Sequence, residues 1–335
     1  MSNSDVIVLG AGITGLWQCL LLAQSGFSVR LIERSEIPFD RASSLYAGAM
    51  LAPYCEAEAA LPIVKELGIK SLDLWREHFP DTVFNGSLVV ALDRDKGEIE
   101  RFARFTDGHR RVTGQEISEL EPDLSDQFQE ALFYENEGHI DPLTTLQKLL
   151  DTAVKADVTV EFGVEEFDPP AGSTTIDCRG LASQDELRTL RGVRGERAII
   201  RTSEIELRRP VRLLHPRFPL YIVPWTENRF MVGATVIERE DAHPPSVRST
   251  LELLSSAYAL NPAFGEAEIL DLSAGVRPAF ADNCPRIILD NQRIYVNGLY
   301  RHGFLMAPAL ASLVARYLTT GEKDSEIIVE DRSQW

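Results

Sequence analysis

Three closely spaced glycines near the start of the chain constrain the fold more than any other feature of the sequence. Residues 10–15 read Gly-Ala-Gly-Ile-Thr-Gly, a GxGxxG pattern between an apolar stretch and an amphipathic one. Gly10 permits a tight turn, Gly12 lets the backbone approach a pyrophosphate, and Gly15 lets a helix pack closely on a strand. The pattern therefore predicts a phosphate-binding turn between a strand and a helix.

The flanking residues complete a strand–helix–strand unit. We expect one strand in the apolar residues before the glycines and another at residues 27–34. A helix whose first residues are Ile13 and Thr14 joins them. The free N–H groups at the start of that helix would face the phosphates. Glu33 ends the second strand, where a carboxylate can accept hydrogen bonds from ribose hydroxyls. We therefore expect a parallel sheet that binds an ADP-containing dinucleotide.

Small residues soon after the second strand bear on which dinucleotide is bound. Such residues let the backbone come close to the ribityl and pyrophosphate groups of a flavin, although composition alone fits a plain small-residue loop equally well. The chain contains no second GxGxxG pattern, which disfavours a reductase that uses NAD(P)H to reduce FAD. On these residues alone, FAD and NAD both stay open. The small residues are Ala42, Ser43, Ala47, Gly48 and Ala49.

Composition limits the partners. The 34 Lys and Arg residues against 51 Asp and Glu residues give a net charge of −17, which argues against nucleic acid and anionic membranes. A small anionic substrate remains compatible, because a few arginines can reverse the potential inside a pocket. The four cysteines are widely spaced and the histidines lack ligand spacing, so we expect reduced thiols and no metal. With no evident signal peptide or transmembrane run, a cytoplasmic protein is expected.

The pattern of residues changes at about position 195. Parallel α/β elements precede it, β-branched alternating runs with a hairpin follow it, and α/β elements return at the end. We expect an α/β fold in which a Rossmann-like nucleotide-binding domain is assembled from separated segments, and a second, α+β domain with a mainly antiparallel sheet is inserted into it. The expected ranges are 1–80, 135–192 and 275–335 for the first domain, and 81–134 and 193–274 for the second.

Motifs spread over nearly the whole chain lead to one family. They are GAGITG with LIER, ASSLYAGAMLAP, RGVRGE at 191–196, PLYIVP with RFMVGAT, AGVRP at 274–278 and YVNGLYRHGFLMAP. Together they resemble the D-amino-acid oxidase family of flavoenzymes, and most of all its glycine oxidases. The AGVRP motif followed by G-x-x-R-x-G is fairly specific to that family, whereas the dinucleotide loop alone is not.

The resemblance implies an activity. The resemblance makes the nucleotide domain an FAD-binding Rossmann-like domain of the glutathione-reductase type and the α+β domain its substrate domain. Non-covalent FAD would lie extended across the first, and the antiparallel sheet of the second would roof its flavin ring. A glycine oxidase converts glycine and oxygen to an imine that hydrolyses to glyoxylate and ammonia, with release of hydrogen peroxide. In thiamine synthesis the imine feeds thiazole formation. Members of the family often form homo-oligomers, so this chain is a possible homo-oligomer.

The same resemblance assigns roles to single residues. Tyr221 matches the active-site tyrosine of the roof sheet, Arg277 the arginine that binds the substrate carboxylate, and Arg301 a second arginine at the flavin end. Val164 matches the residue whose backbone reaches the adenine. The full set of expected FAD contacts is Gly10, Gly12, Ile13, Thr14, Gly15, Glu33, Arg34, Ala42, Ser43, Ala47, Gly48, Ala49, Val164, Gly298, Tyr300, Arg301, His302, Gly303, Phe304 and Leu305.

Physical reasoning agrees with these roles without requiring them. A guanidinium grips a planar carboxylate through two hydrogen bonds, as a lysine cannot, although an arginine before a proline is usually a solvated loop residue. Tyr221 alternates with apolar neighbours and would also suit a core. A helix beginning near Phe304 would aim its positive end at the flavin and favour the reduced anion. Pro308 is expected in the first turn of that helix, where its missing N–H costs little.

Departures from the family pattern leave the identity of the amine substrate open. Residues 215–220 lack a polar residue that some glycine oxidases place before the tyrosine, and Val236 stands where some have a bulkier side chain. Sarcosine, N-ethylglycine or iminodiacetate are therefore candidates beside glycine, and Arg217 would serve a second carboxylate only if it faced the site. D-Amino acids are a further alternative, as is a dehydrogenase that passes electrons to an acceptor other than oxygen. Some relatives attach FAD to a cysteine in the segment after the substrate arginine; Cys284 lies several residues later in that segment, so non-covalent FAD is expected.

Overall fold

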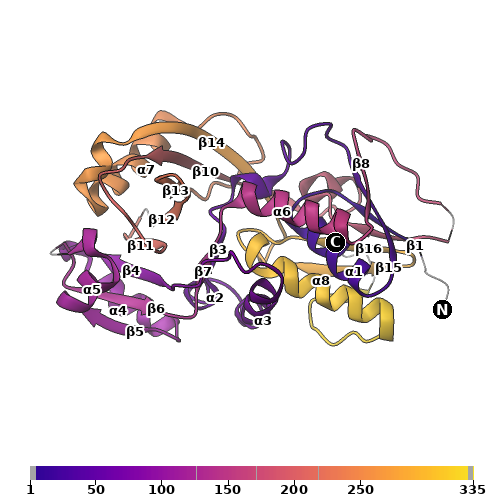
Figure 1. The fold of residues 1–335 in the computed structure, drawn as a ribbon, viewed down its shortest axis with the longest axis horizontal. Helices are drawn as coiled ribbons and strands as arrows, with labels where there is room; N and C mark the ends of the chain where they lie inside the picture. The colour runs from indigo at the N-terminus through magenta and orange to yellow at the C-terminus, as the bar shows by residue number, and fades with distance from the viewer. Residues whose placement is uncertain (1–4, 126, 171, 218, 331–334) are drawn as a thin grey trace.

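The computed structural model describes residues 5–125, 127–170, 172–217, 219–330 and 335. They form two large β-sheets at opposite ends of an elongated molecule, as Figure 1 shows. A small sheet of β3 (Met50–Leu51) and β7 (Gly138–His139) lies between them, next to the short helix α2 (Pro53–Glu56). No helix in the described ranges is both long enough and apolar enough to cross a membrane.

The first sheet has seven strands in the order β17-β15-β16-β9-β1-β2-β8. All neighbours in it are parallel except β15 and β16, which form a hairpin. This arrangement confirms the predicted parallel sheet around the first strand–helix–strand unit. The strands are β1 (Asp5–Leu9), β2 (Ser28–Glu33), β8 (Thr159–Phe162), β9 (Thr174–Asp177), β15 (Arg286–Asp290), β16 (Arg293–Asn297) and β17 (Ile328–Glu330).

Four helices bury one face of the seven-stranded sheet. Val6, Val8 and Leu31 point from the sheet into one large apolar core with them, while Ile7 and Ile32 face the other side. The strands therefore carry apolar residues on both faces, as expected of a parallel sheet. The helices are α1 (Ile13–Gln24), α3 (Pro62–His78), α6 (Pro142–Lys155) and α8 (Gly303–Thr320), labelled from the middle to the right of Figure 1.

The second sheet has eight strands in the order β14-β10-β13-β12-β11-β4-β6-β5. Its neighbours are antiparallel apart from β11 and β4, so the fold class predicted from the sequence is confirmed. The strands are β4 (Ser87–Ala91), β5 (Arg110–Thr113), β6 (Glu130–Tyr134), β10 (Arg191–Arg201), β11 (Val211–Leu214), β12 (Leu220–Trp225), β13 (Arg229–Gly233) and β14 (Glu268–Ala279).

Helices also cover the eight-stranded sheet. Leu253, Ala257 and Leu260 anchor helix α7 to its core, and Ile117 anchors α5. The helices here are α4 (Gly97–Phe105), α5 (Gly114–Leu120) and α7 (Val247–Leu260). Short 3-10 turns are η1 (Ser43–Tyr46), η2 (Asp93–Asp95), η3 (Pro122–Leu124), η4 (Gly180–Asp185) and η5 (Pro262–Glu266). The exact boundaries between the two expected domains stay a prediction.

The position of Pro308 corrects one expectation. Helix α8 begins five residues before it, so the proline lies in the second turn and has no N–H for the carbonyl of Phe304. The indole N–H of Trp75 donates to that carbonyl instead, at 2.9 Å, and the next N–H, of Ala309, donates to the hydroxyl of Ser71 at 3.1 Å. Side chains of α3 thus complete the hydrogen bonding that the proline interrupts.

Candidate active site

A long cleft is lined by residues of both large sheets and brings most of the predicted site residues together. It runs from the GxGxxG turn, past residues 41–50, to the end of β14 and the start of α8. Gly15 and Gly298 are the two predicted residues outside its lining. The predicted residues that line it are Gly10, Gly12, Ile13, Thr14, Glu33, Arg34, Ala42, Ser43, Ala47, Gly48, Ala49, Val164, Tyr221, Arg277, Tyr300, Arg301, His302, Gly303, Phe304 and Leu305.

The glycines of the turn act through close backbone approach. A Cβ on Gly15 would lie 1.9 Å from the carbonyl oxygen of Gly10, so only glycine lets α1 pack here. Gly10 itself has φ +98°, and a Cβ on it would lie 2.7 Å from the carbonyl oxygen of Cys178. Gly298 also has a positive φ, but a Cβ on it would meet the ring of Phe280 at 2.3 Å. The lack of a side chain at Gly298 therefore lets the ring of Phe280 pack against the backbone behind the cleft.

Glu33 is held at the end of β2, beside the turn. One of its carboxylate oxygens accepts from the N–H of Ala11 at 2.7 Å and the other from that of Ser35 at 3.0 Å. The N–H of Val164 donates to the backbone carbonyl of Glu33 at 3.1 Å. The carboxylate is thus fixed where a ribose would meet the carboxyl edge of a parallel sheet.

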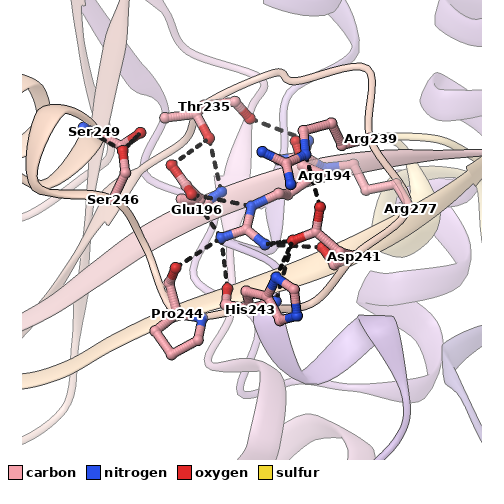
Figure 2. Close-up of polar contacts among 10 residues, drawn as sticks. All are labelled: Arg194, Glu196, Thr235, Arg239, Asp241, His243, Pro244, Ser246, Ser249 and Arg277. Carbon is pink, nitrogen blue, oxygen red and sulfur yellow. Dashed lines mark hydrogen bonds and ion pairs between the residues drawn. The ribbon is translucent and has the colours of Figure 1, made fainter.

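Arg277 supplies a cation to the other end of the cleft. Its guanidinium lies against Gly195, where a Cβ would be 2.0 Å from Nη2. Nη1 donates to the backbone carbonyls of Thr235 at 3.2 Å and Arg194 at 3.4 Å (Figure 2). No carboxylate of the described residues forms an ion pair with it, and burial lowers its pKa. A desolvated guanidinium without a counter-ion is an anion-binding group.

Buried polar residues behind Arg277 fix its two carbonyl partners. The guanidinium of Arg194 bonds to the carboxylate of Glu196 at 2.7 Å, to that of Asp241 at 2.6 Å and to the carbonyl of Pro244 at 3.1 Å (Figure 2). The N–H of Glu196 donates to the hydroxyl of Thr235 at 2.9 Å, and the N–H of Thr235 returns a bond to the carbonyl of Glu196. Thr235, whose carbonyl accepts from Arg277, is therefore held against β10.

Glu56 is a cleft residue that sequence reasoning missed. Its carboxylate, at the end of α2, lies 2.6 Å from Arg212, 3.5 Å from Arg301 and 3.5 Å from His302. Burial alone would raise the pKa of Glu56, but Arg301, Arg212 and His302 outweigh it and hold that pKa well below its ordinary range. In the sequence Glu56 looks like any acidic residue of an exposed helix, because its partners are distant in the chain.

The charges at this end of the cleft do not balance. Arg277 and Arg301 line it with two positive charges and Glu56 with one negative charge, and Arg212, which pairs with Glu56 from outside the lining, adds a third positive charge. His302 adds none at neutral pH, because burial lowers its pKa to about 4. The pocket therefore has a surplus of positive charge that a bound carboxylate would offset.

A second buried carboxyl group lies behind Glu56. The backbone N–H of Cys55 donates to Oε1 of Glu137 at 2.7 Å, and the hydroxyl of Ser87 bonds to Oε2. Glu137 is fully buried, and burial raises its pKa to about 7 despite these bonds. The folded protein therefore favours the neutral form of this carboxyl group between about pH 4.5 and 7, where an exposed glutamate is ionised.

Replacing Glu137 with glutamine is expected to change how stability depends on pH. The folded pKa of about 7 lies above the ordinary 4.5, so this group stabilises the fold fully below pH 4.5 and loses that contribution as pH rises through 7. Wild type should lose about 3 kcal/mol more free energy of unfolding than Glu137→Gln between pH 4.5 and 8. Urea denaturation at several pH values measures this. The exposed Glu135→Gln is the control, and parallel pH curves for wild type and Glu137→Gln would contradict the assignment.

The thiols and the possible metal ligands of the described residues bear on how the cofactor is held. All four cysteines are free and buried, and within those residues no group of three or more His, Cys, Asp or Glu side chains could hold a metal ion. Cys284 does not line the cleft. The expectation of non-covalent FAD stays a prediction.

A nucleotide-binding turn at the edge of a parallel sheet, joined to a cationic pocket under an antiparallel sheet, defines a two-sheet flavoprotein oxidoreductase. The chain belongs to the DAO family of FAD-dependent oxidoreductases, which its residues 5–317 match. FAD is accordingly its cofactor. The turn, the fixed carboxylate of Glu33 and the small residues around Gly48 fit that dinucleotide.

Individual relatives narrow the comparison. The chain is 47% identical to the putative thiamine biosynthesis oxidoreductase ThiO of Rhizobium etli, over 96% of this chain and 98% of that one. It is 26% identical to the D-amino-acid oxidase of Streptomyces coelicolor, over 83% and 84%. In fold it is similar to the glycine oxidase of Geobacillus kaustophilus, with a TM-score of 0.81 at 22% identity over 96% of each chain. The iminodiacetate oxidase of Chelativorans sp. BNC1 gives 0.80 at 20% identity, over 97% and 100%.

Proposed function

We propose that this FAD-dependent oxidoreductase oxidises glycine or a small N-substituted glycine, such as sarcosine or iminodiacetate. The products would be an imine that hydrolyses to glyoxylate, ammonia or an amine, and hydrogen peroxide from oxygen. The single observation that carries the proposal is the guanidinium of Arg277 in the wall of the cleft, which bonds to backbone carbonyls and has no carboxylate partner among the described residues. The 47% identity to a putative thiamine biosynthesis oxidoreductase supports a role in thiazole formation.

The residues of the pocket would act by orienting the substrate. Arg277 would grip the carboxylate through two parallel hydrogen bonds, with the hydroxyl of Tyr221 and the guanidinium of Arg301 beside it. That grip fixes the position of Cα, and positioning of this kind supplies much of the rate of such a reaction. FAD, when bound, supplies the acceptor for the hydride that leaves Cα.

The surplus positive charge would also prepare the amine. A substrate ammonium group entering next to Arg277 and Arg301 meets like charges, which lower its pKa and favour the neutral amine that hydride transfer requires. Glu56 is paired with Arg212 and stays ionised, so it is a poor proton acceptor. We therefore assign Glu56 the role of holding Arg301, and assign the release of the amine proton to solvent.

The proposal is tested by bleaching the bound flavin without oxygen. Glycine, sarcosine, iminodiacetate and D-alanine are mixed in turn with the holoenzyme, and the loss of flavin absorbance is followed. Glycine or one of its N-substituted forms is expected to reduce the flavin, and air is then expected to restore its colour with one peroxide per turnover. Faster bleaching by D-alanine would sink the substrate assignment. Flavin that stays reduced in air would favour a dehydrogenase.

A further inference from the structure

Residues 42–49 connect the two large sheets at the cleft. The hydroxyl of Ser44 accepts from the N–H of Ile13 at 3.0 Å, at the start of the phosphate-binding helix. At the other end of this segment, a Cβ on Gly48 would lie 2.8 Å from the ring of Tyr221. The segment therefore contacts both the nucleotide turn and the roof of the pocket, and its shape determines how the two are spaced.

Arg197 of β10 reaches this segment from the eight-stranded sheet. Its Nη1 donates to the backbone carbonyl of Leu45 at 2.8 Å, and its Nε donates to the hydroxyl of Ser273 at 3.2 Å. Its Cζ lies over the ring of Tyr46, 5.2 Å from the centroid. The side chain is 9% exposed, so these contacts are shielded from water.

The sheet is shaped to receive the segment at this point. Gly195 and Gly275 are directly opposite each other on β10 and β14, and Arg197 is opposite Ser273 two residues further on. A Cβ on Gly275 would lie 2.8 Å from the Cβ of Tyr46, so the tyrosine fills the place of the missing side chain. Tyr46 is thus held between Gly275 and the guanidinium of Arg197. Gly195, opposite Gly275, leaves room for the side chain of Arg277.

We propose that Arg197 is a positioning residue for FAD, although it belongs to the sheet that forms the substrate pocket. It holds Leu45 and Tyr46, and through them it places Ser44 at the nucleotide turn. The role concerns binding of the cofactor, which the family membership establishes, and it does not depend on which amine is oxidised. No contact between Arg197 and the substrate is needed, since Arg197 does not line the cleft.

The test compares Arg197→Met with Arg201→Met. Arg201 is on the same face of β10, four residues away, but it is exposed, and among the described residues its one ion pair is with Glu268 at the edge of the sheet. We expect the dissociation constant of FAD, measured by quenching of flavin fluorescence on the apoprotein, to rise on the order of 10- to 100-fold for Arg197→Met. Arg201→Met should stay within about twofold of wild type, as a surface pair does.

The melting temperature of the apoprotein, measured with and without FAD, distinguishes a role of Arg197 in FAD binding from a role in folding alone. The proposal requires added FAD to stabilise Arg197→Met less than it stabilises Arg201→Met, whatever the melting temperatures of the two apoproteins. An FAD dissociation constant equal to that of wild type would overturn it, and so would a lower apo melting temperature with unchanged FAD binding.

A second variant keeps the proposal testable if Arg197→Met does not fold. Arg197→Lys retains a cation but loses the flat guanidinium that stacks on Tyr46 and bonds to Leu45 and Ser273 together. It is expected to bind FAD on the order of three- to tenfold more weakly than wild type, with Arg201→Lys unchanged. FAD binding by Arg197→Lys that matches wild type would contradict the proposal.

Discussion

Arg277→Lys is expected to lower kcat/KM for the amine substrate by about 10²- to 10³-fold while FAD stays bound. A lysine keeps the charge but cannot form the two parallel hydrogen bonds that fix a planar carboxylate. It would also leave the carbonyls of Arg194 and Thr235 without the donor they now share. Steady-state kinetics measure the loss, and the visible absorbance of the flavin shows that the cofactor is retained.

A second variant tests the same geometry without removing the arginine. A Cβ on Gly195 would overlap the guanidinium of Arg277, so Gly195→Ala must displace that group. We expect a loss of kcat/KM of about 10²-fold, again with FAD retained. Gly97→Ala is the matched control, because a Cβ there meets nothing within 4 Å. Near-normal kinetics in both Arg277→Lys and Gly195→Ala would show that the carboxylate binds elsewhere.

Gly15→Ala is expected to abolish FAD binding at ordinary cofactor concentrations. Its Cβ would lie 1.9 Å from the carbonyl oxygen of Gly10, and because that atom is backbone, helix α1 and the turn must separate. The N–H groups at the start of α1 would then no longer point at the pyrophosphate. We expect the dissociation constant of FAD to rise more than about 100-fold, with a loss of about 1–3 kcal/mol in apoprotein stability from overpacking.

Titration of the apoprotein with FAD and urea denaturation measure these two effects separately. Gly97→Ala again serves as the control, since it adds the same methyl group at the start of a helix without a clash. A Gly15→Ala protein that purifies with full flavin colour would refute the assignment of this turn to the cofactor.

The part of the site that follows from local sequence was predictable. The GxGxxG turn and Glu33 belong to one strand–helix–strand unit, so their spacing alone specifies how they meet. The family resemblance then pointed to Tyr221 and Arg277 in the wall of the same cleft, although their roles stay predictions. Their distance from the turn along the chain means that no local pattern could have joined them to it.

The buried ionic residues were not predictable by such means. Glu56 and Arg212 come from separate segments of the chain, and they meet only because α2 packs under the eight-stranded sheet. Glu137 follows a strand in the sequence and resembles a turn residue, yet it is fully buried. Pro308 was expected in the first turn of its helix but lies in the second, and the reason is again distant in the chain. Trp75 and Ser71 of another helix bond to the backbone groups around the proline and so allow it to lie there.

The burial of the thiols has a consequence for catalytic lifetime. Each turnover of the proposed reaction would release an oxidant inside the protein, and cysteines react with peroxide as thiolates. Burial raises the pKa of all four thiols and so keeps them protonated: Cys19, Cys55, Cys178 and Cys284. Met231 and Met306 are fully buried as well, whereas Met50 is half-buried and lines the cleft, as does the buried Cys178 with its protonated thiol. Gradual inactivation during prolonged turnover would therefore begin with oxidation of one thioether in the cleft wall, and the cysteines would outlast it.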